Sequence, residues 1–228
     1  HHALQFANRL LAADPLFARA NPLLAERLTA INRQDAAYLV HEYMNADWLP
    51  MHFADLANWL VDSKLQYAGS AQPLDHLDAL HLTDTQRELL AGIGDEVLRE
   101  TVRELLQNQQ FRRDLWVKGR RPLGKRQQWQ RFCAQRLVLV SAGSEGGLKV
   151  NGARGEIGLQ DAAYRPLLDA LQTADGPISV AELARQLPDG GYDNALLWQT
   201  VVTLVGMGLV ALAQSELAVA QARPYCDR

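Results

Sequence analysis

The chain has 228 residues, of which 48% are hydrophobic and 21% are charged, and its formal net charge is −3. This length and apolar content favour two modest domains of about 100 residues, each with its own core. The opening HHALQFANRL has no charged and apolar leader, and no apolar run approaches the ~18 residues of a membrane span, so we expect a cytoplasmic protein. Only Cys133 and Cys226 occur, without a CxxC pair, which argues against a disulfide framework or a zinc knuckle.

The first 110 residues are predicted to form about seven short helices packed as a bundle. Residues 3–13 are amphipathic, and Asn21 with Pro22 offers an N-cap and a first-turn proline for the next helix. Further along, Thr83 and Asp95 precede two segments with helical apolar spacing. The loops are short enough for consecutive helices to pack against each other.

A basic band lies in the middle of the chain. Residues 1–110 carry 8 Lys and Arg against 15 Asp and Glu, residues 111–140 carry 9 against 1, and residues 141–228 carry 6 against 10. Phe111, Trp116 and other aromatic residues alternate with these basic ones. Such a band can bind nucleic acid, contact an acidic protein or a neighbouring domain, or form a solvated linker.

After the basic band the pattern changes. LVLV, LKV and EIGL read as short strands separated by glycines. Helices are predicted at 161–173, in SVAELARQLP, where Ser179 and Glu182 form a capping box, and in NALLWQTVVTLVGMG after Asp193. LVALAQSELAVA is predicted to close the series as a hairpin, and this order is typical of a winged helix.

These patterns predict a mainly α fold, α+β overall, in which a helical bundle is followed by a winged-helix domain with short antiparallel strands. The predicted divisions are a helical domain over 1–119, a basic connector over 120–136 and a winged-helix-like domain over 137–228.

Three short motifs combine aromatic, charged and amide groups in a way that a generic helix core does not need. They are HEYMNADW at 41–48, YAGSA at 67–71 and FRRDLWVKG at 111–119. HEYMN lacks the second His of the metalloprotease motif HExxH, and AGSAQ lacks the GxSxG nucleophile elbow. Gly69 is explained by a turn. No catalytic or metal-binding residues are therefore predicted.

The motifs instead predict interface or substrate-binding side chains. The arginines of FRRDLWVKG either form ion pairs that lock the end of the bundle or present a fork to a partner's carboxylate. Trp48 is interpreted as a core anchor. The candidates are His41, Glu42, Tyr43, Asn45, Trp48, Gly69, Ser70, Arg112, Arg113, Asp114, Trp116 and Lys118.

Together the three motifs resemble the regulatory domain that accompanies the catalytic domain of many bacterial class I S-adenosylmethionine (AdoMet) methyltransferases. The resemblance covers roughly 35–119, and the chain from about residue 137 is similar to the C-terminal winged-helix domain of the same proteins, best described in protein-lysine methyltransferases that modify outer-membrane proteins. It implies a non-catalytic regulatory or substrate-recognition region. It also implies two partners, an AdoMet-binding catalytic domain in cis or in trans and a protein substrate.

The chain itself is not expected to bind a cofactor. An AdoMet fold needs a Gly-rich turn that joins a buried strand to a helix. LVLVSAGSEGG offers the glycines, but LKVNGARGEIGLQ follows with strand-like alternation, which predicts a strand, a turn and another strand. AdoMet is therefore assigned to a catalytic domain outside this sequence.

Two alternatives remain: a winged-helix transcriptional regulator and a stand-alone interaction protein. No Lys or Arg occurs between Gln186 and Ala222, although this segment holds the expected recognition helix and wing. Binding to duplex DNA depends heavily on phosphate neutralisation. We therefore predict protein partners and no nucleic acid; the sequence does not decide the oligomeric state.

Overall fold

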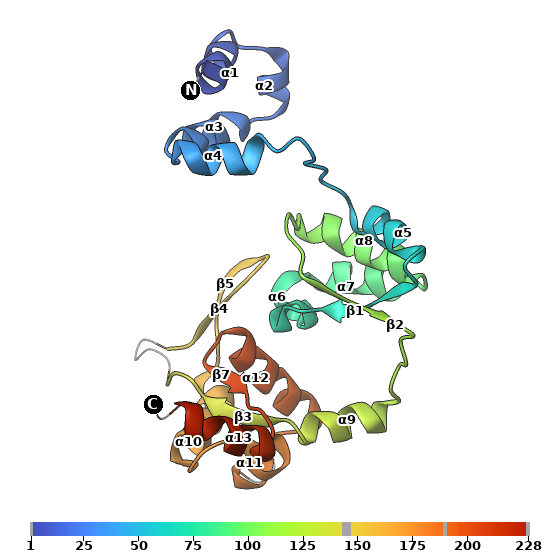
Figure 1. Ribbon diagram of the computed structural model, residues 1–228, viewed down its shortest axis with the longest axis vertical. Helices are drawn as coiled ribbons and strands as arrows, with labels where there is room; N and C mark the ends of the chain where they lie inside the picture. The colour runs from blue at the N-terminus through green and yellow to red at the C-terminus, as the bar shows by residue number, and fades with distance from the viewer. Residues whose placement is uncertain (1, 143–146, 189–190, 227–228) are drawn as a thin grey trace. The chain divides into compact units, whose positions relative to one another are not determined.

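The computed structural model describes residues 2–142, 147–188 and 191–226, and Figure 1 shows its helices and strands. Contacts divide the chain into two units, His1–Met51 and His52–Arg228. The predicted mainly α fold with short antiparallel strands is confirmed. The domain boundaries after residues 119 and 136 stay predictions.

The first unit consists of four short helices: α1 (His2–Ala12), α2 (Leu16–Ala20), α3 (Leu24–Asn32) and α4 (Ala36–Tyr43). The side-chain amides of Asn8 and Asn32 join α1 to α3 through hydrogen bonds of 3.3 and 3.1 Å. The predicted cap at Asn21 is wrong, because Asn21 ends α2 and its side chain donates to Phe17 O, while α3 begins without a side-chain cap. None of the residues 2–51 is buried.

The second unit begins with helices that surround a two-stranded sheet. Its elements up to residue 118 are α5 (Phe53–Val61), β1 (Leu65–Ser70), the 3-10 helix η1 (Pro73–His76), α6 (Asp78–His81), α7 (Asp84–Ala91), α8 (Glu96–Gln107) and β2 (Asp114–Lys118). β1 and β2 are antiparallel, with Leu65 opposite Lys118 and Ser70 opposite Asp114. The turn predicted at Gly69 is therefore wrong, since Gly69 lies within the strand β1.

The glycine in β1 has a clear local role. The register shifts between Tyr67 and Gly69, and Gly69 has φ +142, which side-chain-bearing residues rarely adopt. The bulge lets Ser70 continue the pairing with Asp114.

Aromatic side chains fix the helices to this sheet. Phe53 opens α5 and is 2% exposed. Its ring stacks on Trp116 of β2 at 5.5 Å and meets Tyr67 of β1 edge-on at 4.9 Å. Such pairs stabilise beyond the area they bury, so α5 and the sheet form one packed layer.

The rest of the unit contains the predicted short strands and helices. The elements are α9 (Lys125–Cys133), β3 (Arg136–Leu139), β4 (Lys149–Gly152), β5 (Gly155–Gly158), α10 (Asp161–Thr173), β6 (Ile178–Ser179), α11 (Val180–Gln186), α12 (Asn194–Gly206), β7 (Val210–Leu212) and α13 (Glu216–Cys226). The second sheet has the order β6-β3-β7, and β4 and β5 form a separate hairpin. Leu137, Leu167, Leu183 and Leu204 are fully buried between this sheet and α10–α12.

The hairpin predicted after residue 209 is wrong. β7 pairs antiparallel with β3, with Val138 opposite Ala211, and Ser215 is followed by α13. The Ser215 hydroxyl accepts a hydrogen bond from Ala218 N at 3.3 Å, which favours a helix start at this point. β7 therefore pairs with β3, which lies earlier in the chain, and not with a strand that follows it.

Close packing joins η1 and α6 to the C-terminal elements within this unit. A Cβ at Gly206 of α12 would lie 2.5 Å from Leu74 Cγ, and one at Gly152 of β4 would overlap the Leu80 carbonyl. His81 accepts from Ala153 N at Nδ1, so its protonated Nε2 donates to Leu74 O at 3.0 Å. The segment 73–81 is therefore held on both sides.

Among the described residues, no helix combines the length and the apolar character that crossing a membrane requires.

Candidate functional site

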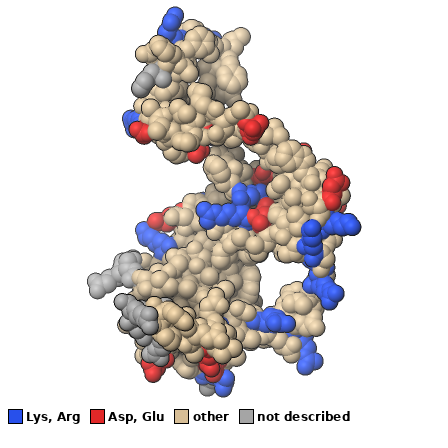
Figure 2. All heavy atoms as spheres, in the orientation of Figure 1, with Lys and Arg blue, Asp and Glu red and all other residues tan. Residues whose placement is uncertain are grey.

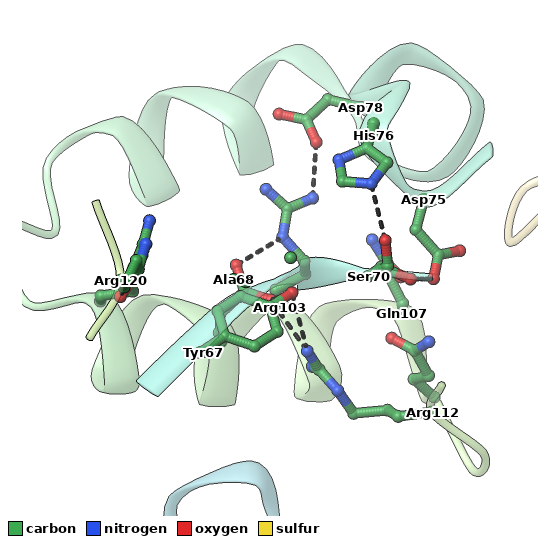
Figure 3. Close-up of a pocket in the computed structure, with 14 residues that line it drawn as sticks. Tyr67, Ala68, Ser70, Asp75, His76, Asp78, Arg103, Gln107, Arg112 and Arg120 are labelled. Carbon is green, nitrogen blue, oxygen red and sulfur yellow. Dashed lines mark hydrogen bonds and ion pairs between the residues drawn. The ribbon is translucent and has the colours of Figure 1, made fainter. Parts of the chain in front are cut away.

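A polar cavity of about 320 Å³ lies beside β1. Its lining comes from β1, η1, α6 and α8, and from the residues on either side of β2 (Figure 3). Two of the three sequence motifs, YAGSA and FRRDLWVKG, meet here because β1 and β2 pair.

Arg112 is held by two carboxylates and an aromatic ring. Its Nε lies 2.9 Å from Asp114 Oδ2, and its Nη2 lies 3.0 Å from Glu100 Oε2. The guanidinium also lies 4.5 Å from the centre of the Phe53 ring. Burial opposes the charged form, but the hydrogen bonds to Asp114 and Glu100 outweigh it and raise the pKa of Arg112 above its ordinary value. Arg112 thus remains a cation and ties β2 to α8.

Glu100 is the carboxylate that several donors share. It is 8% exposed, and it faces Arg112 Nη2 at 3.0 Å, Arg103 Nε at 3.5 Å and the Tyr67 hydroxyl at 3.4 Å. Burial and the negative charge of Glu100 raise the pKa of Tyr67 well above its ordinary value. Tyr67 therefore stays protonated and donates its hydrogen to Glu100.

A second ion pair closes the α6 side of the cavity. Arg103 Nη1 lies 2.5 Å from Asp78 Oδ1, so α8 is tied to α6. Burial opposes the charge on Arg103, but hydrogen bonding to Asp78 raises its pKa above the ordinary value. Each ionic side chain of this wall already has a partner of opposite sign.

Ser70, Asp75 and His76 lie together but are not arranged as a nucleophile with its base. The Ser70 hydroxyl donates to Asp75 Oδ2 at 2.6 Å and accepts from Gln72 N at 3.0 Å. His76 Nε2 lies 2.9 Å from the Ser70 carbonyl oxygen and not from its hydroxyl. His76 is therefore not placed to take the hydroxyl proton, which Ser70 donates to Asp75, and we interpret this group as shaping the turn after β1.

The structure brings together most of the predicted residues of the second and third motifs. Gly69, Ser70 and Arg112 line the cavity, Asp114 binds Arg112, and Trp116 stacks on Phe53. Arg113 and Lys118 have main-chain contacts with or next to β1: the Arg113 carbonyl accepts from Ala71 N at 2.7 Å, and Lys118 pairs with Leu65 at the far end of the strand. The predicted ion pairs of this motif are confirmed for Arg112 and Asp114.

The first motif lies in the other unit. His41, Glu42 and Tyr43 form the end of α4, and Asn45 donates locally to the His41 carbonyl at 2.5 Å. Trp48 is 59% exposed and meets the Tyr43 ring edge-on at 6.3 Å. The interpretation of Trp48 as a core anchor is therefore wrong for this chain.

The side of the cavity that α8 forms was not predicted from the sequence. Glu100, Arg103 and Gln107 all line the cavity, and their spacing of three and four places them on one face of the helix. The spacing can be read from the sequence, but it does not indicate a site, because polar residues at helical spacing are typical of a solvated face. Only the pairing of β1 and β2 shows that the face is covered.

The other sites considered from the sequence add nothing to this one. In the described part of the chain, no three His, Cys, Asp or Glu side chains are placed to hold a metal ion. The Gly-rich segment considered as a cofactor loop includes 143–146, which lie outside the described residues. The predicted strand, turn and strand after it are confirmed by β4 and β5.

Comparison with known proteins identifies part of the chain. A family model described as a predicted methyltransferase regulatory domain matches residues 35–118. An uncharacterized protein of Synechocystis sp. is 32% identical over 225 residues, which is 99% of this chain and 44% of that protein.

Two solved structures of PKMT2 from Rickettsia typhi share the fold, with TM-scores of 0.55 and, for the complex with AdoHcy, 0.53. They are 17% and 18% identical to this chain, and the match covers 93% of it and 45% and 44% of theirs. The chain thus spans less than half the length of the Synechocystis protein and of PKMT2. Residues 35–118 match the model of the methyltransferase regulatory domain family, as the motifs beginning at residues 41, 67 and 111 predict.

Proposed function

We propose that this chain is a non-catalytic regulatory and substrate-recognition region of an AdoMet-dependent methyltransferase. A separate catalytic domain, in cis or in trans, carries AdoMet and the transfer chemistry. The family match over 35–118 supports the association with a methyltransferase. The likeness to PKMT2 and to a much longer Synechocystis protein supports a larger assembly.

The exposed apolar surface of α1–α4 is the observation that carries this proposal. Residues 2–51 include no buried side chain, and Phe6, Leu16 and Phe17 are 64%, 78% and 66% exposed. Figure 2 shows that most of the visible face of this unit is uncharged. A unit of this size must bury apolar area to offset the entropy of ordering its chain. We infer that α1–α4 completes its core on a partner surface.

An apolar groove on this unit is the proposed contact. It encloses about 480 Å³ between α1, α3 and α4, and Leu28, Ile31, Val40 and Met44 line it. Val40 and Met44 belong to the matched family segment, which begins at residue 35. A contact through this groove would connect the regulatory domain to the catalytic domain directly.

The C-terminal elements of the chain are proposed to face protein. β6-β3-β7 with α10–α12 is proposed to act as a winged-helix unit, and the described residues of α12 and β7 include no Lys or Arg. Nucleic acid would find little phosphate neutralisation there. We propose a protein substrate with a lysine as methyl acceptor, in the cytoplasm.

Two measurements test the proposal. Calorimetric titration of AdoMet into this chain should show no binding, while the part of the Synechocystis relative outside the alignment should bind it. One-to-one binding, or methyl transfer by the chain alone, would contradict the proposal.

Formation of a complex between this chain and the unaligned part of the Synechocystis protein tests the proposed contact through the groove. The Synechocystis protein's own two parts serve as the positive control. Val40→Asp, at a side chain 58% exposed, should weaken the complex at least tenfold without unfolding the chain, since it places a charge in the contact. Val140→Asp, at a side chain 63% exposed in the other unit, should leave it unchanged.

A further inference from the structure

Two hydrogen-bond donors in the cavity beside β1 have no acceptor. Gln107 Nε2 and Arg112 Nη1 are buried, and neither meets an acceptor within the described part of the protein. Both side chains line the cavity, as Figure 3 shows. A buried donor without a partner costs about 1–3 kcal/mol, so native structures rarely leave one without a reason. Each of these nitrogens has almost no accessible surface, so an oxygen acceptor that enters the cavity reaches them only when the two side chains turn toward it.

The charges of the lining decide which kind of acceptor fits. Two Asp, two Glu and three Arg side chains line the cavity, so its carboxylates outnumber its guanidinium groups by one. Another anion would add to this excess, whereas a neutral carbonyl oxygen satisfies the donors without adding charge. A basic group next to that carbonyl would balance the carboxylates.

The position of the cavity along β1 provides the third observation. Residues 67–70 all line it, and none of residues 114–118 in β2 does. Side chains of a regular strand alternate between its two faces, but the bulge between Tyr67 and Gly69 interrupts this alternation, so four consecutive residues of β1 can border one cavity. The sheet contains two strands, β1 and β2, in the part of the chain that the structure describes. The cavity thus follows the edge of β1 that faces away from β2.

We propose that this cavity binds an extended peptide that carries a basic side chain. Main-chain carbonyl oxygens of the peptide accept from Gln107 Nε2 and Arg112 Nη1 once these side chains turn toward it, and its backbone runs along the free edge of β1. The basic side chain lies against the carboxylates of η1, α6 and α8. This inference rests on the proposed function, because the peptide would be a segment of the protein substrate.

Nuclear magnetic resonance on the full, ¹⁵N-labelled chain tests the proposal. The probe is the capped tripeptide acetyl-Ala-Lys-Ala-amide, and acetyl-Ala-Glu-Ala-amide, free L-lysine and inorganic phosphate are compared with it. The Lys tripeptide should shift the backbone amide signals of residues 67–70 and the side-chain amide signal of Gln107. The other three should bind at least tenfold more weakly, because they add negative charge or lack two amide carbonyls.

Matched variants distinguish the donors from the rest of the cavity. Gln107→Glu replaces the donor with a carboxylate of the same size, and the loss of the donor should outweigh the added attraction for the basic side chain and weaken binding at least tenfold. Gln128→Glu makes the same change in α9, where the amide already donates to Leu123 O at 2.8 Å, and should leave binding unchanged. If Gln107→Glu unfolds the chain, Gln107→Met removes the donor without adding charge and should show the same loss.

Three results would overturn the inference: no shift at about 10 mM Lys tripeptide, equal or tighter binding of the Glu tripeptide, lysine or phosphate, or unchanged binding in both Gln107 variants. None of them bears on the docking of α1–α4, since the Val40→Asp test uses the other unit. If the Val40→Asp test fails while the peptide still binds, the proposed docking of α1–α4 is contradicted and the proposed peptide site is not.

Discussion

The two units of this chain differ in how much apolar surface they bury. Residues 52–228 contain a buried cluster around Leu137, Leu167 and Leu204, and the aromatic layer around Phe53. Residues 2–51 form four helices without one buried side chain. The first arrangement is a self-contained fold; for the second, we propose that a partner covers the exposed apolar surface.

Hydrogen exchange should show the largest difference between the units. Amides of α12 should exchange only through opening that approaches global unfolding, while those of α1–α4 exchange through local opening close to 0 kcal/mol. Mass spectrometry of the full chain measures both in one sample. Equal protection of both units would contradict this expected difference. Protection of α1–α4 that appears on adding the proposed catalytic partner would support it.

Removing the central arginine should cost the second unit about 3 kcal/mol of unfolding free energy. Arg112→Met leaves the Asp114 carboxylate, whose side chain is 4% exposed, without its partner, and Glu100 with fewer donors. Urea denaturation measures the loss. The matched control, Arg121→Met at an exposed position, should change stability by less than about 0.5 kcal/mol.

Adding one methyl group should disturb the packing of η1 on α12. Gly206→Ala places a Cβ 2.5 Å from Leu74 Cγ and should destabilise the second unit by about 1–3 kcal/mol. Gly94→Ala is the control, because no atom lies within 4 Å of the added Cβ. A stable Gly206→Ala protein, by thermal unfolding, would show that this contact gives way easily.

The smallest expected effect is a pH dependence from Tyr67. Its pKa is raised in the folded chain by burial and by Glu100, so above the ordinary pKa of tyrosine, about 10, the unfolded chain loses this proton first. Stability from this group is complete below about pH 10 and falls as the pH rises further. Tyr67→Phe should make the decline between pH 9 and about 11 shallower than in the unchanged chain. Identical slopes would show that Tyr67 does not titrate differently in the two states.

The local signals in the sequence predicted much of the helical structure correctly. Thr83 caps α7, Asp95 caps α8, Ser179 caps α11 and Asp193 caps α12, each through a hydrogen bond from the amide of the third residue of its helix. A cap depends on a few neighbouring residues, so it is legible without the fold. The wrong prediction at Asn21 also has a local cause, because that residue ends one short helix just before another begins.

The resemblance to the regulatory domain could also be predicted from the sequence, because the motifs at 41–48, 67–71 and 111–119 lie within or next to the segment that matches its family model. Only the tertiary structure decided that β1 pairs with β2, that β7 pairs with β3, and that Glu100 is buried. Strand pairing joins residues far apart in the chain, and its partner is chosen by burial that no local pattern records. The cavity beside β1 exists because of that pairing, so its donors became visible only in the folded chain.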